Sequence, residues 1–487
     1  MNMNRILRVV LMVTLSMALA VGMWGVLPAQ KVAAATCVSV QNGIWADVST
    51  WTDCNGTAPV SGDSVVIRHT VTLDAAANVG TGVVTVESGG VLNLSSYALT
   101  ANTLQIDDGG EVQQGGESEA PSGTITTRSY STNSTYTFNG TQIGLSGIHP
   151  TYGNLNFAPM PGGNGTFGVG LAIQGDLTIN LGDSSEVRFA TGSTPRTHVI
   201  MGDLNVQNGI VVGNNGSANS SVSIGGNLNV TGGTFRGTNG TGGVIYTIAG
   251  NLTYDGGTWQ LDDGGSTGVF VISLNGTTQQ IGGAYPISVD NLTVNAGSTV
   301  TINQIPIVDT LTNNGILKQT QTVNNATVNF LTINTDKYRG VDIQTTNDLG
   351  AVTVAIQGNA DACTNDPDSP AYIKRCFSIT PTNDDAATLT LWATDGELNG
   401  ITNANLALYR YVAGWIEQLT NFNVGTGTNN YNYVTADVDG FSSFLMGHTD
   451  NAPTAVNLSG LNATSTFAAL AVGLLAATGL VVLRKRK

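Results

Sequence analysis

The stretch Gly202-Asp203-Leu204-Asn205-Val206 returns almost unchanged 24 residues later as Gly226-Asn227-Leu228-Asn229-Val230. The same phrase, Gly-Asn/Asp-Leu-Thr/Asn-apolar, occurs three more times, at Gly153–Phe157, Gly175–Ile179 and Gly250–Tyr254. A looser copy, with aspartate in place of glycine, is Asp290–Val294. The six copies begin 22, 27, 24, 24 and 40 residues apart. Repeats of this length are typical of a solenoid, in which each turn buries its apolar face only against its neighbours.

The pattern inside the phrase indicates strands. The leucine and the apolar residue two positions later point to the same side of a strand, while the intervening threonine or asparagine points to the other. We therefore predict a right-handed parallel β-helix over residues 116–335, with the leucines of successive coils stacked inward. Each buried leucine should contribute about 1.5–3 kcal/mol. The 40-residue step predicts either an insertion or a coil that lacks the phrase.

Outside the repeat the chain still favours strands. It contains 62 glycines, and short alternating runs such as Ser64–Ile67 and Val83–Val86 are separated by Gly, Asn and Asp clusters. Long amphipathic segments with a 3.6-residue period are absent from the sequence before the C-terminal end. The predicted fold class is all-β.

The N-terminal residues 1–35 have the pattern of a secretory signal peptide. Arg5 and Arg8 precede an apolar run, and small residues stand at 33–35, where a signal peptidase would cut. The alternative is an uncleaved membrane helix. Cys37 raises the possibility of lipidation, but the residues before it lack the usual lipoprotein pattern.

The C-terminal end predicts a membrane anchor. A spacer at 451–466 leads to the uncharged run Phe467–Leu483, which is followed by the basic residues Arg484–Lys487. Seventeen apolar residues are about the lower limit for crossing a bilayer, and the basic tail should stay in the cytoplasm. We predict a single transmembrane helix within 467–487 and an extracellular body. The arrangement resembles a bacterial cell-surface sorting signal without a Leu-Pro-x-Thr-Gly motif, so removal of the anchor by a sorting enzyme stays an open alternative.

The charge balance limits the partners. The chain has 18 basic and 33 acidic residues and a net charge of −15. Without the three basic residues of the leader and the four of the tail, 11 basic residues face 33 acidic ones, a net charge of −22. Such a field should repel nucleic acids, and we predict no nucleic-acid partner.

Four cysteines form two local pairs. Cys37 is close in sequence to Cys54, and Cys363 is close to Cys376. The even number and the predicted export favour two disulfides, each closing a loop worth about 3 kcal/mol in the chain-entropy model. Free thiols are the alternative. A zinc site is disfavoured because the sequence contains neither Cys-x-x-Cys nor a suitable histidine pair.

Residues 36–115 resemble a known module. The segments that carry this resemblance are Gly43–Trp45, Ser49–Trp51, Pro59–Asp63, Val65–Ile67, Val71–Asp74 and Val83–Gly90. They look like the G8 domain and its bacterial relatives, which precede β-helical regions in large extracellular proteins. The resemblance implies an N-terminal β cap in front of a pectin-lyase-like β-helix. Trp45 and Trp51 would close the open end of the solenoid with aromatic surface, or alternatively stack on sugars.

Residues 336–450 differ from the repeat. The phrase stops, and longer strand-like runs such as Ala351–Ile356, Ala387–Trp392 and Leu406–Tyr411 predict a β-sandwich domain. Its closing segment, Gly440–Gly447, resembles the last strand of sandwich domains in bacterial exported proteins.

The sequence offers few groups for catalysis. Polysaccharide lyases and hydrolases need convergent carboxylates, and the candidates are the pairs Asp107/Asp108 and Asp262/Asp263. Both pairs precede two glycines, so turn formation is the simpler explanation, with weak calcium binding as the alternative. The four histidines are scattered and no Gly-x-Ser-x-Gly motif occurs.

We therefore predict an exported, membrane-anchored cell-surface protein with a structural or adhesive role, without enzymatic activity or a cofactor. A glycan or a cell-surface component is its expected partner. The alternative hypotheses are a carbohydrate-binding or polysaccharide-degrading β-helix and a calcium-dependent surface-layer component.

Overall fold

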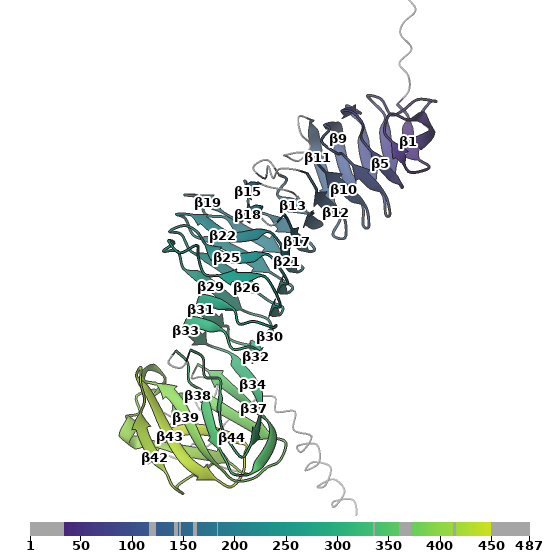
Figure 1. The fold of residues 1–487 in the computed structure, drawn as a ribbon. Helices are drawn as coiled ribbons and strands as arrows, with labels where there is room; N and C mark the ends of the chain where they lie inside the picture. Colours follow the sequence, from purple (N-terminus) through teal and green to yellow (C-terminus); the bar gives the residue numbers. More distant parts are fainter. Residues whose placement is uncertain are drawn as a thin grey trace, which may run out of the picture.

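The computed structural model describes residues 34–115, 123–140, 145, 148–158, 163–182, 184–334, 337–359, 372–412 and 415–449. Across these ranges the chain is all-β with almost no helix, and its longer part is a β-solenoid of about 10 turns (Figure 1). The predicted anchor lies outside the described residues, as does nearly all of the predicted leader. No helix within the described ranges is long and apolar enough to span a membrane.

The solenoid has three faces built from parallel strands. Face 1 contains β1 (Thr36–Ser39), β4 (Ser64–Ile67), β7 (Val83–Val86), β9 (Leu99–Ile106), β11 (Ile125–Tyr130), β13 (Thr151–Tyr152), β16 (Ala172–Ile173), β20 (Thr197–Ile200), β23 (Ser220–Ile224), β26 (Val244–Ile248), β29 (Phe270–Leu274), β31 (Ser288–Val294) and β33 (Ile307–Asn313). Face 2 contains β2 (Gly43–Ile44), β5 (Thr70–Thr72), β8 (Val91–Asn93), β10 (Glu111–Gln114), β12 (Thr135–Phe138), β14 (Asn154–Phe157), β17 (Leu177–Asn180), β21 (Leu204–Asn208), β24 (Leu228–Val230), β27 (Leu252–Tyr254), β30 (Thr278–Gly282), β32 (Thr299–Ile302) and β34 (Ile316–Asn324). Face 3 begins at residue 164 and contains β15 (Asn164–Thr166), β18 (Glu186–Arg188), β19 (Thr191–Gly192), β22 (Ile210–Gly216), β25 (Thr234–Thr238) and β28 (Thr258–Gln260), whereas the short β6 (Ala77–Asn78) pairs with the start of β9.

The predicted stacking of the leucines is confirmed. Along face 2 the strand register pairs five leucines in succession, and each has an exposed fraction of 0%: Leu155, Leu177, Leu204, Leu228 and Leu252. The apolar residue two positions later is buried as well, whereas the residue between them lies nearer the outer surface; these buried residues are Phe157, Ile179, Val206, Val230 and Tyr254. The phrase therefore marks the same face of five consecutive coils.

The sixth, looser copy was wrongly grouped with the others. Leu292 lies in β31 on face 1, where it pairs with Ile272 and Leu311. On face 2 the partner of Leu252 is Ile281 of β30. The 40-residue step thus contains a coil without the phrase, because an isoleucine fills the inward position as well as a leucine does.

Different structures cover the two ends of the solenoid. At the N-terminal end β3 (Trp51–Thr52) follows η1 (Val48–Thr50) and pairs antiparallel with β1. At the C-terminal end the antiparallel Ile333–Tyr338 bridge lies beside the last coil, where Asn334 Nδ2 donates to the carbonyl of Val308 at 2.7 Å. Ile333 is fully buried. Both ends are thus protected from pairing with other strands.

Two antiparallel sheets follow the solenoid. The first contains β34, β37 (Asp348–Gly358), β38 (Tyr372–Pro381), β44 (Ser443–His448), β40 (Leu406–Tyr411) and β41 (Trp415–Glu417). The second contains β35 (Thr327–Phe330), β36 (Val341–Gln344), β39 (Ala387–Thr394), β43 (Tyr431–Val438) and β42 (Asn423–Thr426), and the short helices η4 (Asp395–Glu397) and η5 (Asn403–Asn405) connect strands. The apolar sides of the two sheets belong to the same core as the solenoid interior.

Strand pairing is continuous along face 2, whereas the described strands of face 1 form two separate sheets that end at β11 and begin at β13. β9 pairs with β11 and β10 pairs with β12, so the parallel ladder crosses residue 115. β34 pairs in parallel with β32 through its first residues and antiparallel with β37 along its whole length. The sandwich therefore grows directly from the last coil of the solenoid (Figure 1).

Candidate functional site

The second residue of the repeated phrase forms a hydrogen-bonded ladder along the solenoid. Asp176 Oδ1 accepts the backbone N–H of Asp203 at 2.7 Å, Asp203 Oδ1 accepts that of Asn227 at 2.6 Å, and Asn227 Oδ1 accepts that of Asn251 at 2.7 Å. Asn154 and Asn251 extend the ladder in both directions. Asparagine and aspartate suit this position because a short side chain with an acceptor oxygen can satisfy the backbone of the next coil.

The glycine in front of a ladder residue makes room for the ladder side chain of the preceding coil. A Cβ on Gly202 would collide with Asp176 Oδ1, and a Cβ on Gly226 would collide with Asp203 Oδ1. Gly175 is in the same relation to Asn154. The Gly-Asn/Asp pair is thus a unit: one coil supplies the acceptor, and the next coil leaves out the side chain that would block it.

The outer side of face 2 is polar and carries little charge. Its fourth-position residues pair in register from coil to coil, and the amide of Asn229 donates to that of Asn205 at 2.9 Å. Side-chain amides and hydroxyls of this kind can bind many hydrogen-bonding partners, but they offer no nucleophile or general base with a shifted pKa. The arrangement is that of a structural surface.

The two aspartate pairs proposed as ligand or calcium turns lie at different corners of the solenoid. Asp107 and Asp108 follow β9 and accept from the Gln105 side chain at 2.7 Å and the Asn133 backbone at 3.1 Å. Asp262 and Asp263 follow β28 and accept the backbone N–H groups two residues ahead at 2.5 and 3.4 Å. The fold does not bring the pairs together: Asp262 and Asp263 accept from the backbone of their own turn, whereas Asp107 and Asp108 lie in a turn but bond the Gln105 side chain and the next coil.

The first cysteine pair forms the predicted disulfide. Cys37 of β1 is bonded to Cys54, and Asp63 lies beside it with its carboxylate accepting the backbone N–H groups of Ala35 and Val60 at 2.8 and 2.9 Å. Within the described ranges these three residues are the only group of three or more potential metal-binding side chains that approach one another. Two of the three are joined in the disulfide, so their sulfurs are not available as thiolate ligands.

The second cysteine pair is described only in part. Cys376 lies in β38 and is disulfide-bonded, whereas Cys363 falls outside the described residues. The proposed pairing of these two cysteines therefore stays a prediction.

The two N-terminal tryptophans are buried rather than presented to a ligand. Trp45 and Trp51 meet edge to face with ring centroids 5.3 Å apart, and Trp51 Nε1 donates to the carbonyl of Trp45 at 2.8 Å. This packing matches the capping role and leaves no ring face open for a sugar.

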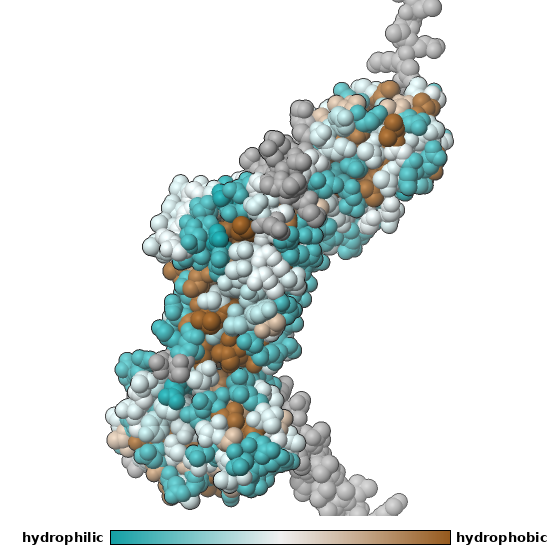
Figure 2. Space-filling view, viewed as in Figure 1, coloured by the Kyte–Doolittle hydropathy of each residue, from teal (hydrophilic) through white to brown (hydrophobic). Residues whose placement is uncertain are grey.

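Most aromatic rings of the solenoid also point inward. A chain of ring contacts runs from Tyr130 through Phe157, Phe189 and Phe235 to Trp259, and all five are buried. Figure 2 shows a largely polar exterior with apolar residues gathered over β29, β31 and β33, where Val269 and Ile307 are exposed. The described part of the solenoid therefore offers no row of aromatic platforms of the kind that a sugar-binding groove requires.

His198 is the one solenoid histidine whose pKa is strongly shifted. It is fully buried; its Nε2 lies 2.9 Å from the carbonyl of Phe189, and its Nδ1 faces the backbone N–H of Leu171 at 3.3 Å. Burial lowers its pKa to about 4, although the hydrogen bond to Phe189 opposes the shift. The imidazole is thus neutral at pH 7, enclosed by Phe167 and Phe189, and has a packing role.

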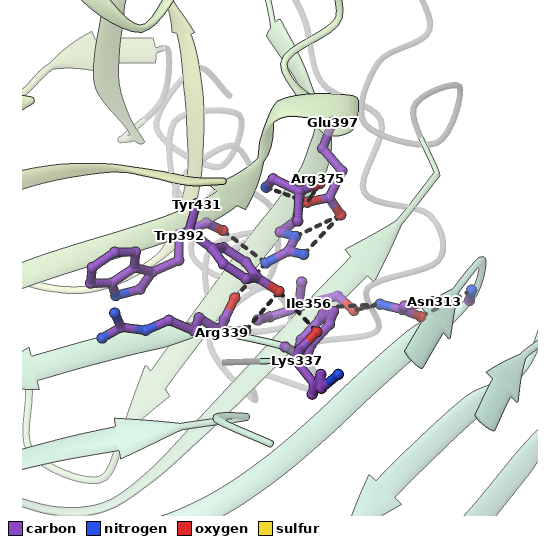
Figure 3. Close-up of polar contacts among 11 residues, drawn as sticks. Asn313, Lys337, Arg339, Ile356, Arg375, Trp392, Glu397 and Tyr431 are labelled. Carbon is purple, nitrogen blue, oxygen red and sulfur yellow. Dashed lines mark hydrogen bonds and ion pairs between the residues drawn. The ribbon is translucent and has the colours of Figure 1, made fainter. Parts of the chain in front are cut away.

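The densest polar cluster lies where the solenoid meets the sandwich (Figure 3). The side chain of Arg375 in β38 is 1% exposed, and its guanidinium donates to Glu397 Oε1 at 2.8 and 3.1 Å and to the carbonyls of Trp392 and Arg339 at 2.8 and 2.6 Å. Burial opposes the charge of Arg375, but the Glu397 carboxylate together with Tyr338 and Tyr431 more than offsets this, and the pKa of the guanidinium is raised. The guanidinium therefore stays charged in the protein interior, paired with a carboxylate that is partly exposed.

This cluster connects the last coil to the sandwich through Tyr338. The Tyr338 ring lies 4.5 Å from the guanidinium carbon of Arg375, and its hydroxyl accepts from Asn313 of β33 at 3.4 Å. Asn313 also donates to the carbonyl of Ile356 in β37 at 3.2 Å. Tyr431 reaches the same segment from the second sheet, since its hydroxyl donates to the carbonyl of Lys337 at 3.1 Å. These contacts thereby hold β33 of the last coil together with β37, β38 and β43 of the sandwich.

A second cation–aromatic pair extends the cluster toward the surface. Arg339 lies over the Trp392 ring at 3.4 Å and within 3.6 Å of Asp342, which accepts from the indole Nε1 of Trp392 at 2.8 Å. Burial raises the pKa of Asp342, and the Trp392 hydrogen bond and Arg339 oppose this rise. The sequence indicated none of these junction residues, because they are scattered between positions 313 and 431 and converge only through the sheet pairing.

Comparisons with known proteins assign no relative. No family model matches the chain, and neither the curated proteins nor the solved structures include a significant match. The resemblance of residues 36–115 to G8 domains thus has no support from these comparisons.

Proposed function

We propose that this chain is an exported cell-surface protein in which the solenoid acts as a rigid, non-enzymatic scaffold for structural or adhesive display. The observation that carries the proposal is the uninterrupted strand ladder, which continues through β34 into the sandwich and is fixed there by the Arg375 cluster. About 10 turns at a strand spacing of about 4.8 Å give a solenoid about 50 Å long.

The chemistry of the surface supports a scaffold over an enzyme. The aspartates that could serve as acids or bases accept backbone hydrogen bonds at separate corners or along the ladder. In the part of the chain that the structure describes, the strongly shifted pKa values belong to interior packing groups such as His198 and to the Arg375 junction. Active sites tend to concentrate such groups in an accessible cleft.

The proposed topology places the solenoid and the sandwich outside the cell, with a G8-like cap at the N-terminal end. The leader within residues 1–35 would direct export, and the apolar run Phe467–Leu483 with its basic tail would hold the chain in the membrane. A disulfide in the first coil is consistent with an oxidising compartment.

Surface display can be tested by expressing the full chain in a bacterium and treating intact cells with protease. We expect intact cells to lose the solenoid epitope while a cytoplasmic control protein survives. A chain that becomes accessible only after cell lysis would contradict the proposed location.

The scaffold role needs a separate assay. The purified protein should release no new reducing ends or unsaturated products from a panel of acidic and neutral polysaccharides. Cleavage that is abolished by a single substitution such as Asp262→Asn would replace the scaffold proposal with the polysaccharide-degrading alternative. A glycan array with the same protein would separate a sugar-binding surface from an inert one.

A further inference from the structure

Asp63 is a buried carboxylate at the N-terminal end of the solenoid. The residue is 3% exposed, and its two carboxylate oxygens accept the backbone N–H groups of Ala35 at 2.8 Å and Val60 at 2.9 Å. The Cys37 sulfur lies 3.8 Å from Asp63 Oδ2, but it belongs to the disulfide and carries no proton to donate. Among the described residues no side-chain cation forms an ion pair with Asp63. The carboxylate thus meets neutral donors alone, although buried charges are generally paired with opposite charges.

The backbone of Ala35 is bonded on both sides of its Cα atom. Its N–H donates to Asp63, and its carbonyl accepts the backbone N–H of Ser64 at 2.8 Å. Its side chain packs against the hydrophobic core, whereas Ala34 is exposed. The part of the chain that the cap requires therefore begins at Ala35.

The three alanines at positions 33–35 leave the cutting site of a signal peptidase open, because each offers the small residue that the enzyme needs before the cut. The structure distinguishes these alternatives. A cut after Ala35 would remove the residue that donates to Asp63, and a cut after Ala33 would place the new amino group on the exposed Ala34. Only a cut between Ala34 and Ala35 puts the new amino group at the nitrogen that already bonds to Asp63.

We propose that processing cuts the Ala34–Ala35 peptide bond and that the freed α-ammonium group of Ala35 forms a buried ion pair with Asp63. In this hydrolysis the C–N bond breaks, the oxygen of a water molecule joins the Ala34 carbonyl carbon to give a carboxylate, and the Ala35 nitrogen takes up both water protons. The Asp63 carboxylate thereby gains a charged donor in place of a neutral one, and charge-assisted hydrogen bonds are the stronger kind. The inference deepens the proposed function and rests on export through the leader.

The pair fastens the first coil of the solenoid at its start. Ala35 directly precedes β1 and Asp63 directly precedes β4, and these neighbouring strands pair in parallel from Thr36 and Ser64 onward. A chain that keeps its leader has only a neutral N–H at this position. Removal of the leader is therefore expected to stabilise the cap as well as to release the chain from the export machinery.

The cutting site can be read by expressing the full chain in a bacterium, extracting it from the membrane and identifying its N-terminal peptide by mass spectrometry. We expect the first residue to be Ala35. A first residue of Ala34 or Thr36, or an uncleaved leader, would overturn the inference. The protease experiment reports location separately. A chain that starts at Ala35 but is shielded in intact cells contradicts only the proposed location, and a surface-exposed chain with another N-terminus contradicts only the inferred cut.

The ion pair can be tested through the pKa of the new amino group. An N-terminal amine ordinarily has a pKa of about 7.7–8.0; burial alone lowers this value, and a neighbouring carboxylate raises it. The purified chain is acetylated at several pH values, and the modified N-terminal peptide is quantified by mass spectrometry. We expect an apparent pKa above about 8 and, at pH 7.5, a rate about tenfold below that of the urea-unfolded chain, since each pKa unit changes the free-amine fraction about tenfold.

A pair of variants separates the carboxylate from general charge. Asp63→Asn keeps an acceptor for the Ala35 nitrogen but removes the charge, so its amine should be acetylated faster than that of the unmodified chain. Asp74→Asn is the matched control, because it removes the same charge from an exposed position near β5 and should leave the rate unchanged. Melting curves verify that both variants are folded, and equal rates in the three folded proteins would contradict the ion pair. Should Asp63→Asn not fold, the unmodified chain still decides, because an apparent pKa at or below that of the unfolded chain overturns the pair.

Discussion

At the scale of single residues, the repeated phrase is explained by space and hydrogen bonding. The leucine fills the interior, the asparagine or aspartate satisfies the backbone of the next coil, and the glycine leaves the volume that this side chain needs. Glycine is required here because of crowding by the neighbouring coil. Gly202 and Gly226, unlike Gly209 or Gly233, do not have a positive φ.

Replacing a phrase glycine should therefore be costly. Gly226→Ala forces a Cβ against Asp203 and the backbone of Gly202, and overpacking of this kind costs about 1–3 kcal/mol. Denaturant titration should show a lower midpoint with an unchanged slope. Gly265→Ala is the matched control because a Cβ there meets nothing and its φ is not in the positive range, so a change within about 0.5 kcal/mol is expected. Equal stability of the two variants would contradict the crowding explanation.

His198 should make the stability of the solenoid depend on pH. Its pKa is about 4 in the folded protein and about 6.5 in an unfolded chain, so between these values the unfolded state binds more protons. The free energy of unfolding should fall by about 3 kcal/mol as the pH drops from 6.5 to 4, and this contribution should be fully present above pH 6.5.

The measurement compares the unmodified chain with His198→Gln at pH 7.5, 5.5 and 4.5. Glutamine can keep a donor and an acceptor but does not titrate, so the variant should lose less stability over this interval. Parallel pH profiles for the two proteins would show that His198 does not carry the effect.

At the scale of elements, the capping structures and the junction decide where the solenoid begins and ends. The tryptophan pair and β3 cover the first coil, and the Ile333–Tyr338 bridge lies beside the last. Arg375, paired with Glu397, then contacts the residues after this bridge through the Arg339 carbonyl and the Tyr338 ring. A buried, fully hydrogen-bonded guanidinium fixes one geometry because breaking its contacts leaves an unpaired charge in the interior.

Removing the buried cation should destabilise the sandwich strongly. Arg375→Met leaves the partly exposed Glu397 and the carbonyls of Trp392 and Arg339 without their donor, and each buried polar group left unpaired costs about 1–3 kcal/mol. Arg68→Met is the control: Arg68 pairs with Glu87 at 2.7 Å, but both side chains are exposed, so a cost below about 1 kcal/mol is expected. Chemical denaturation of both variants checks the difference. Similar costs for the two substitutions would show that burial gives the Arg375 pair no special role.

At the scale of the whole molecule, the shared strand β34 determines how the parts are connected. A strand that belongs to both the solenoid and the sandwich removes the flexible linker that usually separates two domains. The Asn313–Tyr338 and Arg375 contacts add a second connection beside the strand. A force applied to the solenoid should therefore be transmitted to the sandwich, because no hinge separates the two parts.

Electron microscopy of single particles tests this coupling. We expect a rod that ends in a globular unit at one narrowly distributed angle, and a broader distribution for Arg375→Met. Arg68→Met should keep the narrow distribution. A broad distribution in the unmodified chain would contradict the hinge-free junction.

The all-β class, the solenoid and the inward leucines could be predicted because they depend on neighbouring coils that repeat the same local pattern. The Cys37–Cys54 disulfide was predictable for a similar reason, since its partners are 17 residues apart. Asp107, Asp108, Asp262 and Asp263 likewise act in turns, as their sequence context favours. Leu292 shows the limit of prediction from the repeated phrase, because it lies on face 1 and not with the other leucines on face 2. A short phrase specifies a strand with an inward-facing side chain, but it does not specify the face on which that strand lies.

Only the tertiary structure decided the rest. The junction unites residues from Asn313 to Tyr431, and these side chains, distant in sequence, meet because antiparallel pairing sets their register. A sequence by itself determines which residues must be buried and how often, because burial follows the local period. Which distant strands lie side by side is a property of the folded sheet, and so are the contacts between them.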